Sequence, residues 1–119
     1  MSRRRLDRVG EELRAEISRV LRAEVADPRV ALVTILRVDV SPDLRNALVF
    51  WSRIERPGSP PLEAIAAGLE SAAPFVRRQL AHALPLKRMP ALTFRFDAAI
   101  EEGDRTLALL REISGEPSE

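Results

Sequence analysis

Apolar residues recur at steps of three and four along the first part of the chain. Between residues 5 and 26 they are Leu6, Val9, Leu13, Ile17, Val20, Leu21 and Val25. This spacing gathers them on one side of a helix, so the segment predicts an amphipathic α-helix with Ser2 available as its N-cap. The helix is expected to end at Asp27-Pro28-Arg29, because proline disfavours the helical conformation in the residue before it.

Two shorter apolar runs follow, separated by a polar corner. Ser41, Pro42 and Asp43 each favour a turn, so residues 33–40 and 46–53 are predicted to form an antiparallel hairpin. Alternation divides the first run into an apolar face, Thr34, Leu36, Val38 and Val40, and a second face, Val33, Ile35, Arg37 and Asp39. The second run is apolar on both faces up to residue 52, which predicts a strand in the centre of a sheet.

The pattern returns to a helical period after a Pro-rich loop at residues 56–61. One helix is predicted from Leu62 to Ala72 and a second from Pro74 to about Leu84. Proline at the first position of a helix costs little, so Ala72-Ala73-Pro74 is interpreted as a break between two helices. Residues 92–97 then alternate cleanly and predict a third strand whose inward side chains are Leu92, Phe94 and Phe96.

A short helix is predicted at residues 104–113, and residues 114–119 are expected to be a disordered tail. The elements together predict one α+β domain over residues 3–113, with a three-stranded sheet backed by helices. Its core is expected to hold Leu13, Ile17 and Leu21 against Leu36, Val38, Phe50 and Phe94.

The composition argues against catalysis and against a cofactor. The chain has 119 residues, no cysteine, no tyrosine and one histidine, His82, so disulfides and thiolate metal sites are excluded. Its five glycines form no phosphate-binding loop, and the acidic residues Glu101, Glu102 and Asp104 do not have the spacing of a metal-binding loop. No apolar run is long enough to cross a bilayer and no signal peptide is evident, so a cytoplasmic protein without a membrane partner is expected.

Basic residues gather at particular places although the net charge is only +1. The clusters are Arg3, Arg4, Arg5 and Arg8 at the start, Arg77 and Arg78 in the predicted second helix of the pair, and Lys87 with Arg88 just after it. All 19 cationic residues except Lys87 are arginines. Arginine suits phosphate recognition through its planar fork of donors, but a GC-rich genome produces the same bias, and both explanations stay open.

The predicted helix start at Pro74 is a candidate phosphate site. Free backbone N–H groups and the helix dipole attract anions there, and Arg77 and Arg78 would add charge. Cations at a helix N-terminus are otherwise unfavourable, so a compensating partner is expected. The alternative is that Arg77 pairs with a carboxylate of the same chain while Arg78 is solvated.

Several motifs together resemble the bacterial ribosome-binding factor A family over roughly residues 3–113. They are Arg8-Val9, Asp27-Pro28-Arg29, residues 38–44 with Ala47, Ala72 with Phe75 and Arg77, residues 84–97, and Gly103 ahead of Leu109-Leu110. The resemblance implies a type II K-homology-like fold of order αββααβ, with no catalytic site and no small-molecule substrate. It also implies binding to the free small ribosomal subunit and its rRNA, late rRNA maturation that includes 5′-end processing, and importance in the cold.

One departure from the family pattern lies at the break between the predicted helices. The family has an Ala-any-Gly kink, whereas this chain has Ala72-Ala73-Pro74. Proline keeps the break but removes a backbone donor, so Arg77 and Arg78 are expected to carry more of any phosphate contact.

Two functions of different classes remain in view. The first is a monomeric, non-catalytic RNA-binding assembly factor whose eight clustered cations contact rRNA, and the second is a protein-interaction or dimerisation module on the same fold. Asp97, after the last strand, is expected either to pair with an arginine or to cap the following turn.

Overall fold

A computed structural model describes residues 3–97 of the chain. Its elements are the helix α1 (Arg3–Ala23), a 3-10 turn η1 (Pro28–Val30), the strands β1 (Val33–Val40) and β2 (Asn46–Arg53), the helix α2 (Leu62–Ala83) and the strand β3 (Ala91–Phe96). The fold class and the order of elements match the prediction, with the helix pair present as one helix. The predicted helix at residues 104–113, the acidic residues before it and the tail from residue 114 lie outside the described residues.

The helix α1 forms because its apolar residues share one face, as predicted. Val9, Leu13, Ile17, Val20 and Leu21 are all buried on that face. Gly10 lies on the buried side as well, and a Cβ atom there would overlap the backbone carbonyl oxygen of Val38 in β1. The absence of a side chain at Gly10 therefore allows the backbones of α1 and β1 to approach each other closely.

The Asp-Pro-Arg segment follows the end of α1 at Ala23 and caps the short turn η1. Asp27 Oδ1 accepts a 2.9 Å bond from the backbone N–H of Arg29, and the Arg29 guanidinium donates back to both carboxylate oxygens. The Arg29 side chain, followed by its backbone N–H, lowers the pKa of Asp27 below its ordinary value. These contacts give the motif a structural role as the cap of η1.

The polar corner between β1 and β2 forms the predicted turn. Ser41 Oγ donates to Asp43 Oδ1 (2.7 Å) and accepts from the backbone N–H of Asn46 (3.0 Å). Asp43 Oδ1 also accepts from the backbone N–H of Arg45, and Leu44 completes the reversal with a φ of 62°. The Ser41 and Asp43 side chains thus satisfy the backbone of the turn.

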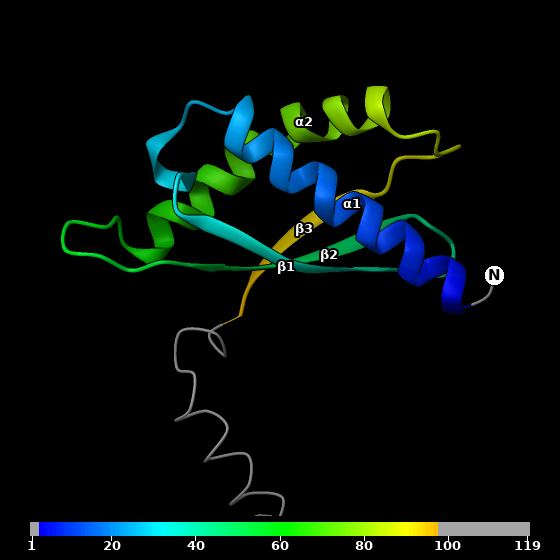
Figure 1. Cartoon of the computed structure of the whole chain (residues 1–119), viewed down its shortest axis with the longest axis horizontal. Coiled ribbons are helices and arrows are strands. Elements are labelled where there is room, and N and C mark those ends of the chain that lie inside the picture. The colour runs from blue at the N-terminus through cyan, green and yellow to red at the C-terminus, as the bar shows by residue number, and fades with distance from the viewer. Residues whose placement is uncertain (1–2, 98–119) are drawn as a thin grey trace, which may run out of the picture.

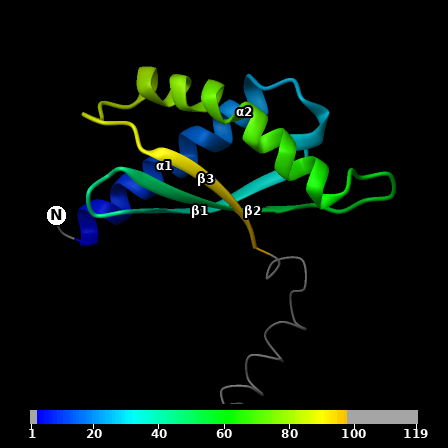
Figure 2. The ribbon, with the colours of Figure 1, turned by 180° about the vertical axis from the view of Figure 1, so that it is seen from behind.

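The sheet has the order β1-β2-β3, with β1 antiparallel and β3 parallel to β2. β2 is therefore the central strand, as predicted, and β1 and β3 are edge strands. Figures 1 and 2 show α1 and α2 on the same face of this sheet. The core lies between the sheet and these helices, and its largest fully buried side chains include Trp51, Leu13, Ile17, Leu69 and Leu80.

One predicted face assignment in β1 is wrong because the strand contains a bulge. The pairing register with β2 shifts between Ile35 and Arg37, so Leu36 has no partner in the ladder. The shift turns Ile35 and Val38 to the same side, where both are buried in the core. Leu36 is only half-buried and does not belong to the core cluster.

The prediction that Phe50 packs against α1 is also wrong. Its neighbours in β2, Val49 and Trp51, are 0% and 2% exposed, so alternation turns Phe50 to the face that carries neither helix. Phe94 does pack against the core, together with Leu92 and Phe96, which confirms the predicted inward face of β3.

The predicted break at Ala72-Ala73-Pro74 is not a break between two helices. Residues 62–83 form one continuous helix that contains Pro74, and Figure 1 shows its axis changing direction part-way along. Proline kinks a helix because its ring crowds the preceding turn and it offers no N–H to the carbonyl four residues earlier, here that of Glu70. The helix termini expected at Pro74 therefore do not exist, and the assignment of the kink to Ala72-Ala73-Pro74 stays a prediction.

Two kinds of feature are absent from the described part of the chain. Neither α1 nor α2 is long and apolar enough to span a membrane. Residues 3–97 also contain no group of three His, Cys, Asp or Glu side chains placed to hold a metal ion.

Candidate functional site

Three segments of the chain meet at one end of the molecule. The start of α1, the turn between β1 and β2, and the loop from α2 to β3 lie on the same side in Figure 1 and in the reverse view of Figure 2. We call this end, with the eight predicted cations that it carries, the basic end. These cations are Arg3, Arg4, Arg5, Arg8, Arg77, Arg78, Lys87 and Arg88, and all eight are exposed.

Most cations of the basic end have no carboxylate partner among the described residues. Several arginines elsewhere are held by neighbouring carboxylates, as in Arg14–Glu11, Arg19–Glu16 and Arg29–Asp27, although Arg22, Arg56 and Arg95 form no ion pair within residues 3–97. Within residues 3–97, no carboxylate forms an ion pair with any of the following six: Arg3, Arg4, Arg8, Arg78, Lys87 and Arg88. Their charge is thus left available for an external anion.

Arg77 has a different role from Arg78. Its Nη2 donates to the carbonyl oxygen of Met89 (2.8 Å) and its Nε to that of Pro90 (3.1 Å), so it holds the α2–β3 loop against the helix. The carboxylate partner of the alternative interpretation is not found within residues 3–97, where backbone carbonyls accept from Arg77 instead. Arg78 lies with its guanidinium 6.0 Å from the centre of the Phe75 ring and makes no such tether.

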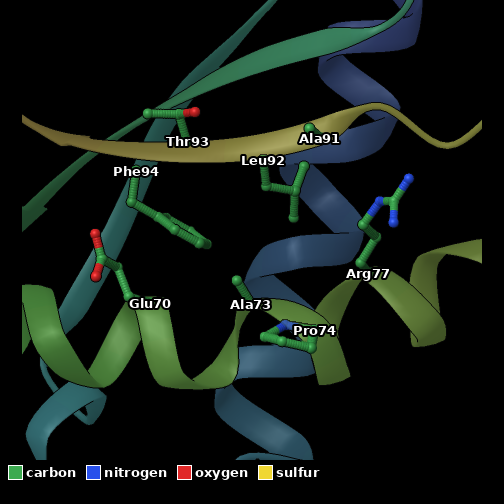
Figure 3. A pocket seen from close by; sticks show the side chains of 8 residues that line it. All are labelled: Glu70, Ala73, Pro74, Arg77, Ala91, Leu92, Thr93 and Phe94. Atoms are coloured by element: carbon green, nitrogen blue, oxygen red, sulfur yellow. The ribbon is translucent and has the colours of Figure 1, made fainter.

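A groove runs between α2 and the free edge of β3 (Figure 3). It encloses about 560 Å³ and is lined from the helix by Glu70, Ala73, Pro74 and Arg77, and from the strand by residues 91–94. Its walls are largely apolar, with the acidic Glu70 and the basic Arg77 as its charged members. Sequence reasoning missed this groove; the only available sign was that the last strand of the predicted sheet would expose an edge beside the kinked helix.

The comparisons with known proteins decide the family. The sequence profile described as ribosome-binding factor A matches residues 5–110. The chain belongs to this family.

Its relatives cover nearly the whole chain. Ribosome-binding factor A of Synechocystis is 42% identical over 92% of the chain and 83% of its own length, and that of Brevibacillus brevis is 38% identical over 98% and 94%. Among solved structures, the crystal structure of ribosome-binding factor A from Thermus thermophilus has a TM-score of 0.67 at 22% identity, covering 76% of this chain and 93% of that one. A homology model of the Thermus factor, fitted into the cryo-EM map of a 30S complex, gives a TM-score of 0.64, also at 22% identity, over 78% and 96%.

In this member of the ribosome-binding factor A family, Arg77 and Arg78 do not lie at the start of a helix. They lie in the second half of a continuous helix, so no helix N-terminus with free N–H groups exists beside them. The helix dipole acts mainly within the first and last turns, and Arg77 and Arg78 lie in neither, so the helix itself requires no compensating anion there. The expectation of a compensating anion at a helix N-terminus applies instead to α1. Its first turn contains Arg3, Arg4 and Arg5 and no acidic residue.

Two further polar residues lie at the ends of strands. Arg45, which sequence reasoning did not include, belongs to the basic end through the β1–β2 turn; its Nε lies 4.0 Å from Asp43 Oδ2 and its side chain is 66% exposed. Asp97 extends the sheet by one hydrogen bond, since its backbone N–H donates to the Trp51 carbonyl at 2.8 Å. The predicted role of its carboxylate, as an ion-pair partner or a cap, stays a prediction.

Proposed function

We propose that this protein is a non-catalytic ribosome assembly factor. It binds the free small ribosomal subunit and assists the late maturation of its rRNA, including processing near the 5′ end, with its greatest importance in the cold. It acts in the cytoplasm as a monomer formed by one domain over residues 3–113.

The observation that carries this proposal is the basic end. Cations that no carboxylate of the described chain neutralises are suited to rRNA phosphates, because each phosphate contact releases condensed counterions. Membership of the ribosome-binding factor A family supports the choice of partner. The Thermus factor of the same fold has been fitted into a 30S complex, which supports the small subunit in particular.

The proposed mechanism involves no bond chemistry by the protein. Phosphate contacts fix position and orientation on a nucleic acid without reading its sequence. A rigid end that engages several phosphates at once would hold a local rRNA conformation while other maturation steps proceed.

Cosedimentation with purified small subunits tests the proposal, with assembled ribosomes and naked rRNA as comparison partners. The wild type should bind free small subunits, and its affinity should fall steeply as salt concentration rises. The double variant Lys87→Ala/Arg88→Ala should bind more weakly, and its log–log salt slope should flatten by up to about 0.9 for each phosphate that the variant no longer binds. The matched control is Arg22→Ala/Arg56→Ala, which removes the same charge from exposed arginines in the last turn of α1 and in the β2–α2 loop. Figure 1 shows both of these segments away from the basic end.

Two results would contradict parts of this account. Equal loss of binding in the control pair would show that total charge, rather than the basic end, determines affinity. Binding with little salt dependence would favour the alternative of a protein-interaction module, because an apolar interface does not depend on counterion release.

A further inference from the structure

The face of the sheet turned away from α1 and α2 carries its own organised side chains. The buried residues Ala47, Val49 and Trp51 face the core, so alternation turns Leu48 and Phe50 to the opposite face. Both are half-buried and neither belongs to the core cluster or packs against it. An aromatic ring is thus held on the middle strand of this face.

Two arginines flank that ring in register. Phe50 pairs with Arg37 across the β1–β2 ladder and with Arg95 across the β2–β3 ladder, so the three residues form one row across the sheet. The Arg37 guanidinium lies 4.1 Å from the centre of the Phe50 ring. The Arg37 side chain is 56% exposed, and Arg95 is exposed as well. The row therefore presents an aromatic surface and two cations to solvent.

We propose that this row binds an unpaired stretch of RNA by base stacking. An aromatic ring and a guanidinium plane are the groups on which splayed-out bases stack, and such platforms on a sheet are an established way of holding single strands. Arg37 and Arg95 have a second use as phosphate contacts on either side of the stacked base. The inference rests on the proposed role in rRNA binding and gives the protein a second contact of a different kind.

The row and the basic end are suited to different parts of an RNA. The basic end consists mainly of exposed cations from helix starts, helices and loops, which suits the backbone of a folded rRNA helix. The row requires a base that is free to stack, so it selects unpaired nucleotides. A maturing rRNA exposes such nucleotides before its final pairing.

The alternative is that the row only stabilises the fold and binds no ligand. In that case Arg37 covers Phe50 and pairs with Asp39, whose Oδ2 lies 3.4 Å from Arg37 Nε. The side chains of Asp39 and Arg37 are both 56% exposed, so the pair is open to solvent and to competition by a phosphate. Arg95 has no ion pair within residues 3–97, which leaves a cation in the row that an internal role does not use.

Binding of labelled 12-nucleotide oligoadenylate and oligouridylate by the full-length chain, measured by fluorescence anisotropy, tests the inference. Phe50→Leu keeps an apolar side chain but removes the ring, and it should weaken oligonucleotide binding roughly 5- to 150-fold. Phe50→Tyr should restore binding. Arg37→Gln and Arg95→Gln should each flatten the salt slope by up to about 0.7. Arg22→Gln, on α1, is the control and should change neither quantity.

Ultraviolet crosslinking provides a readout independent of affinity. The tryptic peptide of residues 46–53 contains Phe50, and it should carry the crosslinked nucleotide. A full-length wild type that binds small subunits but no single strands would overturn this inference and leave the proposed function standing. The same holds if Phe50→Leu binds as tightly as the wild type. If removal of residues 98–119 is needed before oligonucleotides bind, the face is covered by the protein's own C-terminal segment and the inference is likewise wrong.

Discussion

Replacement of Gly10 by alanine tests the closest approach between a helix and the sheet. Alanine is favoured over glycine in a helix interior by about 1 kcal/mol, so propensity alone predicts a more stable protein. The added Cβ, however, would overlap the carbonyl oxygen of Val38, although its 3.9 Å distance to Val40 Cγ2 is an ordinary contact. A backbone carbonyl within a strand cannot rotate aside, so α1 would have to move away from β1.

The change in the free energy of unfolding is the difference between the overlap cost and the propensity gain. Forcing an extra carbon into a packed interior costs typically about 1–3 kcal/mol, and a rigid neighbour places the cost in the upper part of that range. After the propensity gain is subtracted, Gly10→Ala is expected to reduce the free energy of unfolding by about 1–2 kcal/mol. For a domain of this size that corresponds to a fall in Tm of roughly 4–16 °C.

Urea unfolding followed by tryptophan fluorescence measures this loss. Trp51 is the only tryptophan and is 2% exposed, so its emission reports the integrity of the core. Gly68→Ala is the control, because a Cβ there would meet Arg29 Cβ at 3.1 Å, Val30 Cγ1 at 3.2 Å and Arg29 Nε at 3.3 Å, contacts that shifts of only a few tenths of an ångström relieve. Its stability should stay within about 1 kcal/mol of the wild type. A Gly10→Ala protein about 1 kcal/mol more stable than the wild type would show that space exists between α1 and β1.

Three further outcomes are expected. Arg77→Ala should lower the free energy of unfolding, measured with urea, by about 1–3 kcal/mol, because it removes two charge-assisted bonds to the α2–β3 loop. Arg78→Ala should change the same free energy by less than about 0.5 kcal/mol. Ser52→Ala should leave stability unchanged or raise it by up to about 1 kcal/mol in the same assay, since the buried hydroxyl has no hydrogen-bond partner within residues 3–97. The pKa of Asp43 is lowered, chiefly by the Ser41 hydroxyl, so its contribution is present above the unfolded pKa and is lost as pH falls below about 4; Asp43→Asn should flatten the pH dependence of Tm in that window.

The parts of the fold that sequence can predict are those with a regular period or a clear turn. The stripe of α1, the Ser41-Pro42-Asp43 corner and the alternation of β3 each depend on local chemistry, and each is confirmed. The central position of β2 also follows from its apolar faces.

The errors arise where tertiary packing overrides a local rule. A bulge at Leu36 inserts one residue and reverses the face of all that precedes it, and alternation alone does not reveal where a bulge lies. Pro74 is compatible with a helix start or with a position inside a helix, and the structure has the second. The role of Arg77 could not be predicted because its acceptors, the Met89 and Pro90 carbonyls, are backbone atoms of a loop.

The parallel pairing of β3 with β2 has a consequence for the order of folding. Its register joins Asn46 to Ala91 and Trp51 to Phe96, and each pair is separated by 45 residues (91 − 46 and 96 − 51). The hairpin of β1 and β2 closes only a short turn, so its formation costs much less chain entropy. We expect β3 to dock last and its amides to exchange with solvent first. Since β3 forms one wall of the groove beside α2, that groove is completed only in the final step of folding, whereas the cations of α1 are in place before it.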